Sequence, residues 1–191
     1  MAIQAIPNVG TQLDRAIVAY LIANGVGLWR WTKIGDCVVW PADGLAIKTY
    51  PNITVWSHQS THTPVLTGIE EFDTTVTCKF SAAGAAQQAN PYSVRVARDA
   101  ILGLMLACML QSDDGATLDA TAKAITTAGR ALATAGTDQE KTNNADMAQF
   151  TCLHVYYHGT ISRGKPDEAG CDWVEMRGFK ISACPTAIDM G

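Results

Sequence analysis

The clearest pattern in this chain is an alternation of apolar and polar side chains between residues 69 and 82. One side of the alternation carries Phe72, Thr74, Val76, Cys78 and Phe80. The opposite side carries Glu71, Asp73, Thr75, Thr77 and Lys79. Because successive side chains of a β-strand point to opposite faces, this pattern predicts a long strand with one buried face.

A long helix is predicted after this strand, with Asn90 as its N-cap, Pro91 at its first position and its end near Leu110. Its only charged residues are Arg95, Arg98 and Asp99. These charges fit either solvated first turns or salt bridges between subunits. Its later apolar residues point in all directions, and they include Met105, Leu106 and Met109. Such a helix needs cover on more than one side, from the sheet and from either the rest of the chain or a neighbouring subunit.

An amphipathic helix is predicted near the N-terminus, with Thr11 as its N-cap and Asp14 in its first turn. Leu13, Ile17 and Leu21 recur every four residues and form one apolar face. The pair Asn24-Gly25 is typical of a helix C-terminus.

Between residues 27 and 57 the pattern changes to short extended runs, which predict strands over 36–40, 45–50 and 53–57. Four of the five tryptophans lie between Trp29 and Trp56. Their clustering indicates either a contact surface, which would include Trp29 and Trp31, or a small satellite core. Residues 57–64 are polar and are expected to form a loop.

Residues 112–148 are rich in alanine, threonine, glycine and asparagine. One weak apolar stripe is formed by Leu118, Ala122, Ile125, Gly129 and Leu132. Gly129, Gly136 and many threonines disfavour a free helix. We therefore interpret this segment as an insertion that is partly helical and becomes ordered against a partner.

Two further strands are predicted over 150–160 and 171–184, forming a hairpin with a bulge near Gly178. In the first of them, Cys152, His154, Tyr156 and His158 are expected on one side. The order of elements favours an α+β fold, an antiparallel β-sheet with helices packed on one face. We expect a single domain over 1–191, with a strand-rich elaboration at 27–57 and an Ala/Thr-rich one at 112–148.

Composition narrows the class of protein. With 48% hydrophobic and 17% charged residues the chain is globular, and its net charge of −4 argues against a general nucleic-acid binder. No apolar run reaches the length of about 18 residues that a membrane span needs, and residues 1–7 have no features of an export signal. The six cysteines form no C-x-x-C motif, so we expect reduced, mostly buried thiols, with a disulfide framework as the alternative.

Two histidine pairs have the H-x-x-x-H spacing of zinc ligands, His58 with His62 and His154 with His158. That spacing brings two ligands together only on a helix, whereas residues four apart in a strand are separated by about 13 Å. Glu71 and Asp73 share a strand face and could act as paired carboxylates, but a solvated or interface-facing strand explains them more simply. We therefore expect no catalytic, metal-binding or cofactor-binding residues and no enzyme activity, with a small metal-dependent hydrolase as an alternative.

A family resemblance is carried by four stretches: Gly10-Thr11-Gln12-Leu13-Asp14, Thr67-Gly68-Ile69-Glu70-Glu71-Phe72-Asp73-Thr74-Thr75-Val76, Arg95-Val96-Ala97-Arg98-Asp99-Ala100-Ile101 and Asp172-Trp173-Val174-Glu175-Met176-Arg177. With the Asn-Pro-capped helix and the closing hairpin, they make the chain resemble the tail terminator proteins of tailed phages, also called head–tail joining or minor tail proteins. The resemblance is one of architecture and local texture over roughly two thirds of the chain. Residues 27–57 and 112–148 depart from it because both are longer than the compact family pattern.

The resemblance implies a virion protein that forms a ring homo-oligomer, a hexamer, at the tail–head junction after assembly in the host cytoplasm. Its partners would be other copies, the tail tube protein and neck or connector proteins, with no membrane, and with DNA only as it passes through the channel. Another neck or head-completion adaptor is the alternative. Candidate interface residues are Glu71, Asp73, Arg95, Arg98, Met105, Leu106, Met109, Trp29 and Trp31.

Overall fold

A computed structural model describes residues 9–24, 38–41, 52–59, 69–81, 103, 107–110, 119–157, 159, 161–164 and 171–184 of this chain. Its helices are α1 (Val9–Ala23), α4 (Asp119–Leu132), α5 (Asp138–Asn143) and the 3-10 helix η2 (Ala145–Gln149). Its strands are β1 (Val38–Pro41), β2 (Asn52–Gln59), β3 (Glu70–Ser81), β4 (Thr151–Tyr157), β5 (Ile161–Gly164) and β6 (Cys171–Cys184).

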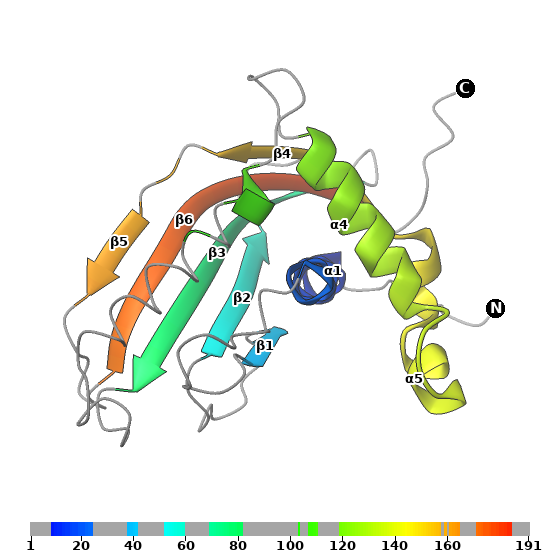
Figure 1. The fold of residues 1–191 in the computed structure, drawn as a ribbon. Helices are drawn as coiled ribbons and strands as arrows, with labels where there is room; N and C mark the ends of the chain where they lie inside the picture. Colours follow the sequence, from blue (N-terminus) through cyan, green and yellow to red (C-terminus); the bar gives the residue numbers. More distant parts are fainter. Residues whose placement is uncertain are drawn as a thin grey trace.

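The strands form one sheet in the order β1-β2-β3-β6-β4, and β5 also pairs with β6. The β2–β3, β3–β6, β4–β6 and β5–β6 pairs are antiparallel, whereas β1 runs parallel to β2. The sheet curves, and α1 and α4 lie together on its concave side (Figure 1). The predicted α+β fold with helices on one face of the sheet is therefore confirmed.

The alternation that predicted β3 corresponds to real burial. Phe72, Thr74 and Val76 are buried, whereas Glu71 and Asp73 remain partly exposed. The hydroxyl of buried Thr74 forms a hydrogen bond of 2.8 Å with that of Ser57 on β2, so this polar group is satisfied in the core.

The bulge predicted near Gly178 is also present. Thr74 pairs with Phe179 and Val76 pairs with Met176, so β6 contains one more residue than β3 between these two pairs. An extra residue of this kind bends the strand and increases its twist.

Helix α1 buries the predicted face of Leu13, Ile17 and Leu21, each with no exposed surface. The helix begins at Val9, however, so the prediction that Thr11 is the N-cap is wrong. Val9 is only 2% exposed, and packing of this residue extends the helix beyond the local capping signal. At the other end, Asn24 donates from its backbone N–H (3.1 Å) and its side chain (2.8 Å) to the Tyr20 carbonyl.

Helix α4 is part of the core, which differs from the interpretation of 112–148 as an insertion ordered by a partner. Ile125 is fully buried and Ala122 is 2% exposed, on the side that packs against α1 and β4. The reason is close helix packing: a Cβ atom added at Gly129 would lie 2.8 Å from Cβ of Ala16 on α1. The glycine that disfavours a free helix allows the two helices to approach each other.

The helical residues 107–109 are held by α1 and α4. The Tyr20 hydroxyl donates a hydrogen bond of 2.6 Å to the Cys108 carbonyl, and the Thr121 hydroxyl donates one of 3.3 Å to the Met109 carbonyl. Carbonyls at the end of a helix lack partners within the helix, so these two side chains satisfy them. Cys108 and Met109 are buried in the same core.

Helix α4 also forms hydrogen bonds with the start of β4. Thr126 accepts a hydrogen bond of 2.9 Å from the backbone N–H of Cys152, and Arg130 donates one of 2.8 Å from Nε to the Phe150 carbonyl. The β4–β6 register shifts between Cys152 and His154. Because of this irregularity Cys152 is buried while His154 is exposed, so the prediction that both share a side is wrong.

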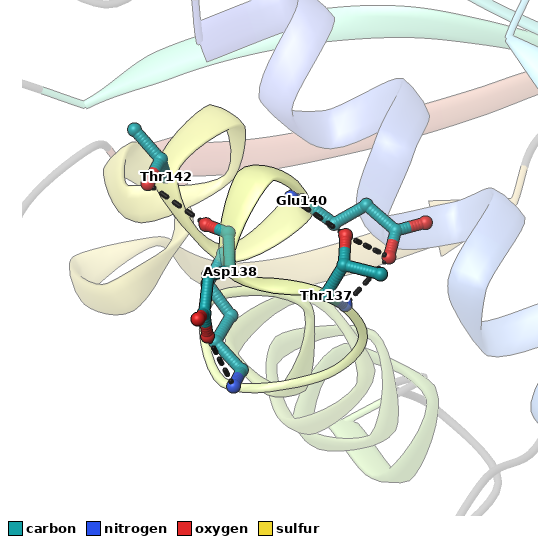
Figure 2. Close-up of polar contacts among 5 residues, drawn as sticks. Thr137, Asp138, Glu140 and Thr142 are labelled. Atoms are coloured by element: carbon teal, nitrogen blue, oxygen red, sulfur yellow. Dashed lines mark hydrogen bonds and ion pairs between the residues drawn. The ribbon is translucent and has the colours of Figure 1, made fainter.

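Helix α5 begins with a complete capping box, in which Thr137 and Glu140 hydrogen-bond to each other (Figure 2). The Thr137 N–H donates to Glu140 Oε2 at 2.7 Å, and the Glu140 N–H donates to the Thr137 hydroxyl at 3.3 Å. The reciprocal bonds satisfy two N–H groups at the start of the helix. They also lower the pKa of the Glu140 carboxyl, because both the Thr137 backbone and its side chain donate to the charged form.

Other predictions have mixed outcomes. The strand predicted over 53–57 is confirmed as β2, but β2 continues to Gln59, so residues 57–59 are not the loop that the polar sequence predicted. The strand predicted over 36–40 appears as β1 at Val38–Pro41. The strand predicted over 45–50 lies outside the described residues.

Candidate interaction surface

The face of the sheet opposite α1 and α4, which we call the outer face, carries exposed aromatic side chains. Trp56 on β2 is 56% exposed and Tyr156 on β4 is 40% exposed. Within the described part of the chain, the outer face includes Trp56, His58, Glu71, Asp73, Thr75, His154 and Tyr156, with Thr54, Thr77 and Ser182 beside them. The covered face is apolar, because Ile53, Val55 and Val76 are all fully buried there.

Strand pairing arranges the outer face into a row that crosses four strands. His58 on β2 pairs with Asp73 on β3, and Asp73 pairs with Lys180 on β6. Lys180 in turn pairs with Tyr156 on β4. Residues directly opposite each other in antiparallel strands have Cβ atoms about 5 Å apart, so the row is a continuous strip.

The pair formed by His58 and Asp73 in this strip is weak and open to solvent. His58 Nε2 lies 3.9 Å from Asp73 Oδ2, and their side chains are 52% and 39% exposed. An ion pair this exposed contributes between about 0 and 1 kcal/mol. The ring centroids of Trp56 and His58 are 5.5 Å apart, and those of His154 and Tyr156 are 6.0 Å apart. The outer face therefore presents Trp56 and Tyr156 on either side of Glu71 and Asp73, and Lys180 is the residue paired between Asp73 and Tyr156.

The structure places the predicted interface residues in three groups. Glu71 and Asp73 lie on the outer face, partly exposed. Met109 is fully buried against the rest of the chain, so its side chain belongs to the core of the single subunit. The remaining six, Trp29, Trp31, Arg95, Arg98, Met105 and Leu106, lie outside the residues whose side chains are described.

Trp56 and Tyr156 were not among the predicted interface residues. The sequence contained a signal for each, since Trp56 belongs to the tryptophan cluster and Tyr156 alternates with buried Val155. Their placement on one face depends on the strand order, because β3 and β6 lie between β2 and β4.

His58 and His154, the first members of the two histidine pairs, lie on strands β2 and β4. His62 and His158 are outside the described residues. Among the residues that can be searched, no group of three or more histidine, cysteine, aspartate or glutamate side chains could hold a metal ion.

The side chains of two of the six cysteines, Cys108 and Cys152, are described; both are buried thiols outside any disulfide. Burial raises the pKa of the Cys108 thiol, so this cysteine behaves as a small apolar side chain. For these two positions the prediction of reduced, buried cysteines is confirmed.

The sequence matches no protein-family model and no curated protein. In the described part of the chain, no helix has both the length and the hydropathy needed to cross a membrane.

Proposed function

We propose that this chain is a structural subunit of a tailed-phage virion, and that copies of it form a hexameric ring that ends the tail tube and joins it to the neck. The proposal rests on the resemblance to tail terminator proteins and on the α+β fold that the resemblance implies. The observation that carries it in this structure is the outer face, an exposed sheet surface with aromatic and acidic side chains.

The composition of the outer face supports an interface. One open face of an antiparallel sheet is normally polar, because it contacts water. Trp56 instead exposes 56% of its surface at one side of the strip, and Tyr156 exposes 40% at the other. Tryptophan and tyrosine are enriched at the centres of protein interfaces. Truncating one such central side chain to alanine can cost about 2 kcal/mol or more of binding free energy.

The assembly has three kinds of partner: other copies of the chain, the tail tube protein and neck or connector proteins. The ring sits at the tail–head junction of the virion, and DNA contacts it only in passing through the channel. A ring requires that one patch of each subunit contacts a different patch of the next, since such heterologous contacts close into a cycle.

The experiment is native mass spectrometry and negative-stain microscopy of the purified chain, alone and mixed with purified tail tubes. We expect rings of six subunits, at least when tail tubes are present. A chain that remains monomeric and does not bind the tubes would refute the proposal. Binding to the portal side of the neck in preference to the tube would identify a neck adaptor instead.

The matched variants are Trp56→Ala and Ile22→Ala. Ile22 lies on α1 and is 52% exposed, so it offers an apolar side chain of similar exposure away from the outer face. We expect Trp56→Ala to weaken ring formation and Ile22→Ala to leave it unchanged.

A further inference from the structure

The exposed side of α4 carries positive charges, whereas the outer face carries carboxylates. The residues of this side are Lys123, Thr127, Arg130 and Ala131, followed by Thr134 in the turn after the helix, and all five are exposed. They recur at the spacing of one helical stripe. The stripe carries two positive charges and otherwise only small side chains, which allow another surface to approach closely.

Arg130 is held in place before any partner binds. Its Nε donates to the Phe150 carbonyl at 2.8 Å, and its Nη2 donates to the Thr151 hydroxyl at 2.7 Å. A side chain that is already ordered loses less conformational entropy on binding. The guanidinium is thus a fixed positive group at the surface, next to the start of β4.

From these two surfaces we infer that the outer face of one subunit docks on the exposed side of α4 in the next copy of this chain. The inference rests on the proposed function, because it identifies the two patches that would form the ring contact. The occupant of the outer face is a second copy, since the chain itself carries complementary charges: the carboxylates Glu71 and Asp73 outnumber Lys180 on the first patch, and Lys123 and Arg130 lie on the second.

The aromatic residues suit the same contact. A lysine or arginine cation is attracted to the face of a tryptophan or tyrosine ring, most strongly when water is excluded. Trp56 and Tyr156 flank the carboxylates Glu71 and Asp73. The charged groups of Lys123 and Arg130 can therefore lie over the carboxylates, while the aliphatic parts of the same two side chains pack against the rings. Because the two patches lie on different parts of the subunit, the contact is heterologous and is able to close into a ring.

The first test locates the contact by photocrosslinking. The photoreactive residue p-benzoylphenylalanine replaces Trp56, and this protein is mixed with isotope-labelled chain, with and without tail tubes. Mass spectrometry then identifies products that join a labelled and an unlabelled copy. We expect position 56 to be joined to the segment 119–134 of the other copy. The same photoreactive residue at Ile22 is the control and is expected to give no such product.

The second test reverses charges one at a time, with Asp73→Lys on the outer face and Lys123→Glu on α4. Each variant places like charges in contact with its own copies, so we expect self-association, measured by sedimentation velocity, to weaken by about tenfold or more. In a mixture of the two variants every contact between unlike copies is complementary, so an alternating ring should form again. Both positions are on the surface, and unchanged thermal unfolding of each variant would show that folding is intact.

The outcomes separate this inference from the proposed function. Intermolecular products at another segment, or a mixture that associates no better than the single variants, would overturn the docking of the outer face on α4. If rings still form in those experiments, the ring proposal stands and a different patch makes the contact. If no ring forms with or without tail tubes, and no intermolecular product appears, both are refuted.

Discussion

Replacing Gly129 by alanine should destabilise the protein, although the same change in a free helix would stabilise it. The added Cβ would lie 2.8 Å from Cβ of Ala16, 3.1 Å from Cδ1 of Phe150 and 3.3 Å from Cε of Met147. The methionine end can move aside. Ala16 cannot, because its Cβ is attached directly to the α1 backbone, and Phe150 is fully buried. Helices α1 and α4 must therefore separate or shift.

The size of the effect follows from two opposing contributions. Alanine is favoured over glycine inside a helix by about 1 kcal/mol. Adding a methyl group to a packed core with no room costs about 1–3 kcal/mol. Since the closest contact is with a rigid atom, we expect a packing cost of about 2 kcal/mol, which leaves a net loss of about 1 kcal/mol after the gain in helix propensity. In a domain of this size that loss lowers the melting temperature by about 3 °C.

The assay is urea and thermal unfolding of Gly129→Ala beside Thr127→Ala. Thr127 is exposed on the same helix, and its hydroxyl donates to the Lys123 carbonyl at 2.9 Å. Thr127→Ala should therefore stabilise α4 by a few tenths of a kcal/mol, roughly the difference in helix propensity.

A double-mutant cycle with Ala16→Gly isolates the close contact. Ala16→Gly removes the atom that Gly129→Ala would strike, so the double variant should be more stable than the sum of the single changes by about 1 kcal/mol. If Gly129→Ala raises stability as Thr127→Ala does, or if the two changes are additive, the account of the α1–α4 packing is incorrect.

Three further predictions concern other parts of the chain. The pKa of Tyr20 is raised from 10.0 to about 12, mainly because burial disfavours the phenolate and also because of nearby Cys108. The stability that protonated Tyr20 contributes is therefore present below pH 10 and is lost as the pH rises towards 12. In urea unfolding, Tyr20→Phe should abolish this pH-dependent loss of stability. The same variant should lower the free energy of unfolding by about 1 kcal/mol at pH 7, because the hydrogen bond to Cys108 is missing. Thr137→Ala should speed hydrogen exchange in α5 without changing global stability. The pKa of Glu140 is lowered from 4.5 by its hydrogen bonds to Thr137, so the capping box is stable above pH 4.5. As the pH falls below 4.5 and Glu140 becomes protonated, the same local loosening of α5 should appear. Trp56→Ala should change the free energy of unfolding by less than about 0.5 kcal/mol while weakening self-association, and an equal effect of Ile22→Ala on self-association would contradict the role of the outer face.

The features that local patterns predicted well were those with a clear period. The alternation around β3 and the four-residue repeat of Leu13, Ile17 and Leu21 each identified an element and its buried face. Both depend only on which side of a strand or helix is apolar, and neighbouring residues carry that information.

The features that the sequence could not predict depend on residues far apart in the chain. Gly129 counts against a helix locally, and only the approach of Ala16 shows why it occurs there. Cys152 changes sides because the pairing of β4 with β6 is irregular. The outer face requires the strand order, since Trp56 and Tyr156 are separated by two strands and lie 100 positions apart in the sequence.

Native mass spectrometry of the purified 20.4 kDa chain, with and without tail tubes, tests the central claim most directly. We expect a ring of six copies that forms at least on the tubes. Asp73→Lys and Lys123→Glu, each measured alone, should fail to form this ring. A chain that remains a monomer under both conditions would contradict the account.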